Sequence, residues 1–194
     1  MHHQEANPHK TLALFDFDGT ITRKDTLLVF VRYTHGSQKM IKGLFFLSPI
    51  LILYKFGLLS SIYAKESLLS HFYKGGTTTY FNTMAKNFAN GYLPNITKRS
   101  ATDRIEWHHQ QGHRVIVVSA SIENYLKHWC RRWGVECIGT ILAERDGYVT
   151  GKINGRNCRR QEKVTRIKNH LNPEAYEEIY VYGDSNGDEQ MLKL

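Results

Sequence analysis

The chain has 194 residues and a mass of 22.5 kDa, enough for a domain to bury a sizeable core without disulfides. Hydrophobic residues make up 41% of it and charged residues 23%, a composition typical of folded proteins, and the absence of a sequence period or bias excludes collagen-like and coiled-coil chains. The net charge of +8 favours an anionic partner, whether a nucleic acid, a membrane surface or a phosphorylated substrate.

The first predicted strand covers residues 11–17 (TLALFDF), a short apolar run with one carboxylate near its end, Asp16, and another directly after it, Asp18. From residue 26 to about residue 92, leucine, phenylalanine, isoleucine and tyrosine recur at helical spacing. Loop signals interrupt this segment at Gly36-Ser37, Ser48-Pro49, Gly75-Gly76 and Gly91. We predict several helices and no strand there.

Alternating helices and strands are predicted for the rest of the chain. In order, they are a helix over 93–111, a strand over 114–118, a helix capped by Ser121 and reaching about 133, a strand over 136–142, a hairpin turning at Asp146-Gly147, a helix over 161–171 and a strand over 179–182. This alternation predicts an α/β fold, a doubly wound parallel sheet with an inserted all-helical segment. We divide the chain into a core, 1–25 with 93–194, and a helical cap, 26–92.

The helical segment carries most of the excess charge. Residues 26–92 contain seven lysines and arginines against one acid, Glu66, so the charge of this segment is +6. Its longest apolar run, 44–54, lies between Lys42 and Lys55 and is too short to cross a bilayer. The run is either the segment's own hydrophobic core, or an interfacial helix that lies on an anionic membrane with its lysines on the headgroups.

The N-terminus and the cysteines bear on location. The first ten residues, MHHQEANPHK, contain no apolar stretch typical of a secretory signal, and three cysteines are too few for a disulfide framework. We therefore expect a cytoplasmic protein, and the apolar run adds the prospect of association with a membrane surface.

Polar side chains follow three of the predicted strands. Asp16 and Asp18 end the first strand, Ser119 follows the second, and Asp184 follows the last. Open parallel sheets bind ligands at the carboxyl ends of their strands, so we expect these side chains to meet. Neighbouring carboxylates repel unless a cation or a shared proton joins them, and such hard oxygen ligands suit Mg²⁺. Lys163, at the start of a predicted helix, would supply a compensating charge.

Simpler roles compete with these interpretations. Asp16 and Asp18 also fit a turn and a helix cap, where Asp and Gly are common. Lys168, on the surface of the same predicted helix, is an alternative to Lys163. Asp184 and Asp188 resemble the start of a calcium loop, but Glu189 stands where that loop needs glycine.

Histidine and cysteine residues elsewhere suggest metal or redox chemistry less strongly. Gly112 interrupts the predicted helix between His108 and His113, so we expect a solvated helix end there and no metal site. Cys158 lies close to Lys163 in the chain, yet nothing near it would lower its pKa, so we expect an inert, structural thiol.

The motifs resemble those of the haloacid dehalogenase superfamily. The segment DFDGT (16–20), a strand ending in Ser119, then Lys163, and finally GDSNGD (183–188) follow one another in the order of its four motifs. Their spacing is similar to that of the phosphoserine-phosphatase-like branch, subfamily IB, which carries a helical C1 cap between the first and second motifs. The resemblance runs from about residue 12 to the end, and four motifs in order are far more specific than DxDGT alone.

The resemblance implies a Mg²⁺-dependent phosphatase. Asp16 would be the nucleophile that forms an aspartyl-phosphate, and Asp18 the general acid and then the base for the hydrolytic water. Mg²⁺ would be held by Asp16, Asp184 and the backbone carbonyl of Asp18. The second acid, Asp18, points to phosphoryl transfer, because relatives that cleave carbon–halogen bonds lack it at this place.

The resemblance also implies residues that bind the phosphoryl group and the leaving group. Ser119 and Lys163 would hold phosphoryl oxygens, and Asp188 would hold Lys163 or a metal-bound water. Asp25 matches an acid that phosphoserine enzymes place near the substrate amine, although it fits a helix cap equally well.

Substrate identity is less defined. Phosphoserine enzymes use a cap arginine for the substrate carboxylate, and this chain has no arginine between Arg32 and Arg99, so phosphoserine is not favoured. Some members of the branch act on lipid phosphates, so the expected substrate is a lipid phosphate or a small phosphorylated metabolite. The chain stops six residues after Asp188, whereas relatives usually continue with another short strand.

Two other functions stay open. One is a phosphate-binding or nucleic-acid-binding module on a catalytically silent scaffold, which the basic segment motivates, although no motif of a known nucleic-acid reader is present. The other is a phosphomutase, which would share the first covalent step and then pass the phosphoryl group to another hydroxyl.

Overall fold

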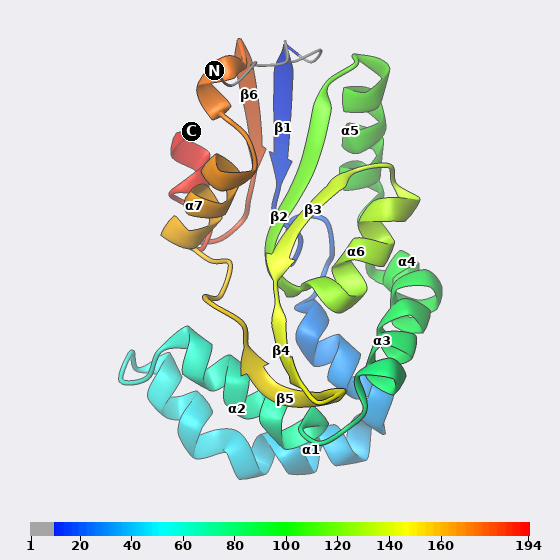
Figure 1. The fold of residues 1–194 in the computed structure, drawn as a ribbon, viewed down its shortest axis with the longest axis vertical. Helices are drawn as coiled ribbons and strands as arrows, with labels where there is room; N and C mark the ends of the chain where they lie inside the picture. Colours follow the sequence, from blue (N-terminus) through cyan, green and yellow to red (C-terminus); the bar gives the residue numbers. More distant parts are fainter. Residues whose placement is uncertain (1–9) are drawn as a thin grey trace.

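Figure 1 shows the fold as a computed structural model, which describes residues 10–194. Its centre is a four-stranded sheet in the order β3-β2-β1-β6, in which every neighbouring pair is parallel. The strands are β1 (Thr11–Phe15), β2 (Arg114–Ile122), β3 (Glu136–Thr140) and β6 (Glu178–Tyr182). Because β2 and β6 join opposite sides of β1, chain connections diverge there, which is where open α/β sheets bind ligands.

Helices cover both faces of this sheet. On one face lie α5 (Arg99–Gln110) and α6 (Glu123–Arg132), and on the other lies α7 (Gln161–His170), which runs beside the short turn Met191–Lys193 (Figure 1). Alternate strand residues fill the two cores, one built on Ala13, Phe15 and Val117, and the other on Leu12, Leu14 and Ile116. The predicted doubly wound α/β fold is confirmed.

The chain between β1 and α5 is helical. It forms α1 (Thr26–Lys55), α2 (Ser61–Tyr73), α3 (Thr78–Asn87), a π-helical turn (Phe88–Tyr92) and α4 (Leu93–Ile96). In Figure 1, α1 and α2 lie beyond the carboxyl ends of the strands, at one end of the molecule. The single helix predicted over 93–111 is instead α4 and α5, because Thr97 is extended and the Lys98 amide donates to the carbonyl of Ile21.

Helix α1 is longer than predicted. A kink at Gly36, with φ 78° and ψ 163°, marks the expected break there, but the break predicted at Ser48-Pro49 is wrong. Pro49 has no amide proton to give to the carbonyl of Phe45, and the Ser48 hydroxyl donates to that carbonyl instead, at 2.7 Å. The side chain therefore replaces the missing backbone bond and the helix continues.

The predicted hairpin is formed by β4 (Leu142–Arg145) and β5 (Tyr148–Ile153), which pair in antiparallel fashion. Asp146 (φ 52°) and Gly147 (φ 80°) make its tight turn. The hairpin packs on α2, where the Glu66 carboxylate accepts from the Ile153 amide at 3.0 Å. A Cβ on Gly151 would lie 2.4 Å from Ser70 Cα, so the two elements approach as closely as backbone allows.

Two further expectations can be compared with the structure. His108 is fully buried, with Nδ1 2.8 Å from Nδ1 of His113 and Nε2 3.0 Å from the hydroxyl of Tyr182, so the expected solvated helix end is wrong for this residue. The aromatic neighbours Phe15 and Trp107 enclose its ring. Within residues 10–194, none of the helices combines the length and the apolar character that crossing a bilayer requires.

Candidate active site

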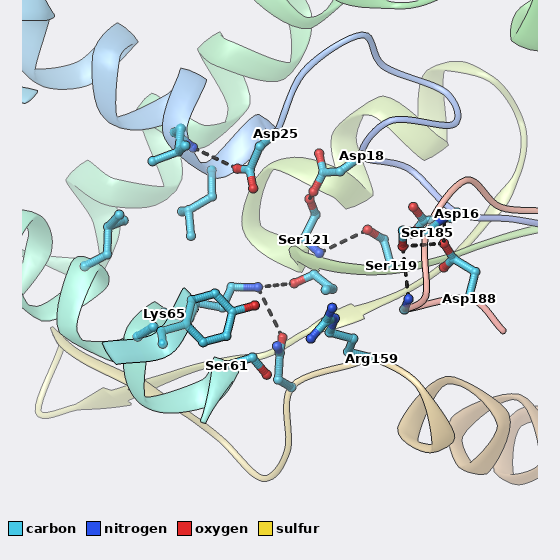
Figure 2. Close-up of a pocket in the computed structure, with 18 of the residues that line it drawn as sticks. Asp16, Asp18, Asp25, Ser61, Lys65, Ser119, Ser121, Arg159, Ser185 and Asp188 are labelled. Atoms are coloured by element: carbon cyan, nitrogen blue, oxygen red, sulfur yellow. Dashed lines mark hydrogen bonds between the residues drawn. The ribbon is translucent and has the colours of Figure 1, made fainter. Parts of the chain in front are cut away.

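A pocket of about 400 Å³ opens at the carboxyl ends of β1 and β2. Figure 2 shows Asp16 and Asp188 at one end of it, Asp18 and Asp25 along one side, and Lys65 with Arg159 on the opposite side. The polar lining comes from the strand ends and the loops that follow them, from the loop before α7 and the start of that helix, and from Ser61 and Lys65 of α2. Helices α1 and α2 supply the apolar lining, which consists of Leu27, Leu28, Leu51, Tyr54, Ala64 and Leu68.

Three charged side chains meet at the closed end of the pocket. The Lys163 ammonium lies 2.5 Å from Oδ1 of Asp16 and 2.6 Å from Oδ1 of Asp188, and all three side chains are buried. Lys163 occupies the first turn of α7, as predicted, and not Lys168, which is exposed. The loop after β6 positions Asp188, whose second carboxylate oxygen accepts from the amide and hydroxyl of Ser185, at 3.1 and 2.8 Å.

The charges of this cluster depend on one another. Burial disfavours the Lys163 ammonium, but Asp16 and Asp188 outweigh that effect and raise the pKa of Lys163. Burial acts on Asp188 too, yet the charge of Lys163 holds the pKa of that carboxyl below its usual value. For Asp16, burial prevails and raises the pKa, with the charge of Lys163 opposing it. The lysine thus keeps two close carboxylates compatible in a site shielded from water.

Asp18 is held from three directions. Its Oδ1 accepts from the amide and hydroxyl of Thr26, at 2.9 and 2.6 Å, and its Oδ2 accepts from the hydroxyl of Ser121 at 2.6 Å. Burial is the main cause that raises the pKa of Asp18 to about 6, and the charge of Asp25 adds to it. Ser121 was predicted to cap the following helix. That prediction is wrong, because the helix begins after Ile122 with no side-chain cap and the hydroxyl binds Asp18.

Ser119 lines the pocket, but it lies inside β2, which continues to Ile122 and does not end at residue 118 as predicted. Its hydroxyl oxygen accepts from the Ser121 amide at 3.0 Å, which fixes the side chain in the turn. The pairing of β2 with β3 changes register between Val118 and Ile122, and the residues of this irregular stretch, Ser119, Ala120 and Ser121, line the pocket.

Asp184 lies near the acids of β1 but, unlike them, is exposed. Thr20 donates to its Oδ1 at 3.1 Å, and a Cβ on Gly19 would lie only 2.0 Å from its Oδ2. Oxygen atoms of Asp16, Asp184 and Asp188 all fall within 4.8 Å of one another. Three hard carboxylate donors this close, in a site that also admits backbone carbonyls, fit a divalent cation such as Mg²⁺. The structure thus adds Asp188 to the predicted acids, whereas the Asp18 side chain is engaged elsewhere.

Sequence analysis missed several pocket residues. Lys65 reaches from α2 to the backbone carbonyl of Ala120 and to the Asn157 side-chain oxygen, the latter at 3.2 Å. Burial lowers the pKa of Lys65, an effect that the charges of Asp18 and Asp25 oppose. Arg159, in the loop before α7, lines the same side. The +6 charge of the helical segment hinted at such a residue, but nothing in the local sequence singled one out.

Asp25 and Cys158 behave as the sequence suggested. Asp25 caps α1 by accepting from the Leu28 amide at 3.1 Å, and it also lines the pocket, so its two predicted roles are compatible. Cys158 is fully buried, and burial raises the pKa of its thiol to about 12, which agrees with an inert structural role.

Fold and site together define an enzyme of the α/β class whose acidic centre lies at the carboxyl edge of a parallel sheet, against a buried lysine. Comparison with known proteins gives the family. The family profile described as haloacid dehalogenase-like hydrolase matches residues 13–193, and the chain belongs to this family. The resemblance that its motifs predicted is therefore confirmed.

Individual relatives agree with this assignment. Protein CicA of Caulobacter vibrioides is 31% identical over 185 residues, which cover 94% of this chain and 82% of that protein. A protein of unknown function from Bordetella pertussis Tohama I has the same fold, with a TM-score of 0.82 at 24% identity over 95% of this chain and 86% of that one. A phospho-aspartyl intermediate analogue of phosphoserine phosphatase gives 0.68 at 20% identity, over 95% and 83%.

Proposed function

We propose that the protein is a Mg²⁺-dependent phosphomonoester hydrolase that works through an aspartyl-phosphate on Asp16. The observation that carries this proposal is the arrangement of Asp16, Asp18 and Lys163 around one end of a single pocket. A nucleophile, a proton donor and a buried cation at that end fit a phosphoryl group and its leaving oxygen. The likeness to a phospho-aspartyl analogue of phosphoserine phosphatase supports the same chemistry.

In the first step, a carboxylate oxygen of Asp16 attacks phosphorus and the bond from phosphorus to the leaving oxygen breaks. Asp18 gives its proton to that oxygen, so the leaving group departs as an alcohol. Lys163 neutralises negative charge on the transferring group, and Ser119 with the backbone of the β2 turn binds its oxygens.

In the second step, water attacks the phosphorus of the aspartyl-phosphate. Asp18, now a carboxylate, accepts the proton of that water, and the bond from phosphorus to the Asp16 oxygen breaks. Inorganic phosphate leaves, and Asp16 and Asp18 return to their starting states. The hydrogen bonds from Thr26 and Ser121 hold the Asp18 carboxylate in one orientation through both steps.

We assign Mg²⁺ to Asp16, Asp184 and the backbone carbonyl of Asp18, with Asp188 beside them. The bound ion would supply the positive charge that lets an anionic phosphate approach several carboxylates. Asp188 would keep Lys163 in position, since its Oδ1 lies 2.6 Å from the ammonium.

We further propose that residues 26–92 act as a cap that selects the leaving group. Leu28, Leu51 and Tyr54 of α1 form an apolar wall of the pocket. Lys65 and Arg159 lie across the pocket from Asp18 and Asp25. This lining favours a phosphomonoester with an apolar part and a further oxygen-bearing group, as in a lipid phosphate, over phosphoserine. A small phosphorylated metabolite with an apolar portion is the other candidate.

Phosphate release from an aryl phosphate, with Mg²⁺ and then with excess chelator, tests the reaction class. We expect release that the chelator abolishes and that Asp16→Asn lowers by at least about a thousandfold, with the fold retained by circular dichroism. Unchanged turnover in Asp16→Asn would refute the mechanism.

Two further assays of the same protein distinguish hydrolysis from the other two candidate functions. Nucleic-acid binding that falls with salt, without any phosphate release from aryl, lipid or amino-alcohol phosphates, would favour a silent binding scaffold. Transfer of the phosphoryl group to an added alcohol, with little free phosphate, would favour a phosphomutase. No contact in the described residues favours either of these over hydrolysis.

A further inference from the structure

The second half of α1 exposes an unusual amount of apolar surface. Each leucine, isoleucine or phenylalanine of residues 10–194 that is more than half exposed lies between residues 41 and 58. The most exposed are Phe45 (81%), Phe56 (74%) and Phe46 (73%). A soluble monomer rarely leaves such a concentration of large apolar side chains uncovered.

These side chains form one surface. Ile41, Phe45, Ile52 and Phe56 follow one another at helical spacings of four, seven and four residues, and therefore share a face of α1 and its C-terminal cap. We call this the apolar face, and it also includes Phe46, Leu53 and Leu58. The opposite side of the helix packs inward through Gly43 and Leu47, against α2.

Positive charge surrounds the apolar face. Helix α1 carries Arg32, Lys39, Lys42 and Lys55, all exposed, and no acidic residue. The first acid beyond its N-cap is Glu66, which binds the β5 hairpin through Ile153 and Lys152. An apolar face whose charged neighbours on α1 are all basic is complementary to a surface that is hydrocarbon inside and anionic at its boundary.

Helix α1 also separates the apolar face from the active-site pocket. Leu51 and Tyr54 line the pocket, and Ile52 and Leu53, beside them in the same turn of α1, are exposed. In Figure 1 this part of α1 runs along the outer edge of the molecule, beyond α2 and the strand ends. A surface that covered the face would therefore lie across the width of α1 from the pocket lining.

We propose that the protein docks on the surface of an anionic lipid bilayer through the apolar face. The phenylalanines and isoleucines would enter the boundary between headgroups and acyl chains, and Lys39, Lys42 and Lys55 would bind the anionic headgroups. Docking deepens the proposed function, because it holds the enzyme at the surface that carries membrane-borne phosphomonoesters, but the binding itself requires no catalysis.

A second copy of the chain is a less suitable occupant. A two-fold dimer would bring the same face of both copies together, and with it two sets of lysines and no acid on either α1. Like charges facing each other across an interface oppose association. A bilayer containing phosphatidylglycerol offers the opposite charge.

Flotation of the full chain with lipid vesicles tests the proposal without substrate. Vesicles of phosphatidylcholine with phosphatidylglycerol, and of phosphatidylcholine alone, are compared for wild type, Phe45→Ser/Phe56→Ser and Lys39→Gln/Lys42→Gln/Lys55→Gln. The control is Tyr80→Ser/Ile141→Ser, which removes two large exposed side chains outside the apolar face. Circular dichroism checks that every variant is folded, and Asp16→Asn is included so that loss of catalysis is separated from loss of docking.

We expect wild type, the control and Asp16→Asn to float with anionic vesicles and much less with neutral ones. The phenylalanine variant should bind at least about tenfold more weakly, and the lysine variant should lose most of its preference for anionic lipid. Equal binding by the phenylalanine variant and wild type would overturn the proposal, as would no vesicle binding at low salt. A wild-type dimer that dissociates in the phenylalanine variant, without vesicle binding, would assign the face to a second copy instead.

Discussion

The carboxylate of Asp18 accepts two hydrogen bonds from Thr26, one from its amide and one from its hydroxyl. Thr26 is the first residue of α1, whose far end carries the apolar face. The acid that follows β1 is therefore tied to the start of the helix that forms the outer wall of the pocket. The same Thr26 oxygen lies 2.8 Å from the Ser121 hydroxyl, so β1, β2 and α1 meet at one fully buried group.

Replacing Thr26 by valine tests this link. Valine has nearly the same shape as threonine but no hydroxyl. The Asp18 carboxylate therefore loses one of the hydrogen bonds that fix its orientation. We expect kcat to fall about tenfold with a smaller change in KM. Thr83→Val is the matched control, because that hydroxyl bonds only to the Thr79 carbonyl on α3. If both variants turn over at the wild-type rate, Thr26 does not position the acid.

Lys163→Met should affect both activity and stability. Asp16 and Asp188 would remain buried without their shared cation, and removing one partner of a buried charge cluster costs about 3–5 kcal/mol. We expect phosphatase activity to fall at least about a hundredfold and the urea midpoint to drop. Lys168→Met, on the exposed side of the same helix, should change neither. If Lys163→Met is as stable as wild type, the buried charge cluster does not contribute to stability as we expect.

Gly19→Ala tests the cation site without touching an acid. The new Cβ would lie 2.0 Å from Asp184 Oδ2, so the carboxylate must move. We expect Mg²⁺ to raise the Tm of wild type, and we expect Gly19→Ala to lose most of that increase. Gly155→Ala carries a matching backbone strain, with φ +83° against +85°, but its Cβ would meet nothing within 4 Å. Loss of the Mg²⁺ response in both variants would mean that strain, and not Asp184, is responsible.

Lys65→Met tests whether the pocket lysine binds the leaving group. The variant keeps the apolar stem but loses the ammonium, which lies outside the Asp16–Lys163–Asp188 cluster. We expect KM for the best substrate to rise about tenfold with kcat nearly unchanged. Lys74→Met, an exposed change at the end of α2, is the control. A fall in kcat alone would instead place Lys65 in the chemical step.

His108 should make stability depend on pH. Burial, with the neighbouring charges of His113 and Arg104, lowers the pKa of His108 to about 4, against about 6.5 in the unfolded chain. Between these values the unfolded state binds the proton and the folded state does not, so the free energy of unfolding falls as pH decreases from about 6.5 to 4. His108→Asn should flatten that dependence in urea unfolding, whereas the exposed His109→Asn should not. If the unfolding free energy of His108→Asn depends on pH as steeply as that of wild type, His108 is not the cause of the dependence.

The elements nearest the chemistry could be predicted because their signals are local. A buried apolar run followed by Asp16 and Asp18, and the Asp146-Gly147 turn, each fix backbone geometry within a few residues. The predictions were wrong at two serines whose side-chain hydrogen bonds could not be read from the local sequence pattern. Ser48 kept α1 intact across Pro49, and Ser121 bound Asp18 in place of capping α6.

By itself, the sequence determined the α/β fold, the family and the order of the acidic, hydroxyl and lysine groups along the chain, since short-range periodicity and motif spacing encode them. Only the tertiary structure decided which of these groups touch, and which side chains join them. Ser121 lies 103 residues from the carboxylate that it binds, and Lys65 lies 55 residues from the Ala120 carbonyl. The same holds for the apolar run in α1: its composition allowed a core or a surface, and packing against α2 buried one side and left Phe45 and Phe56 exposed.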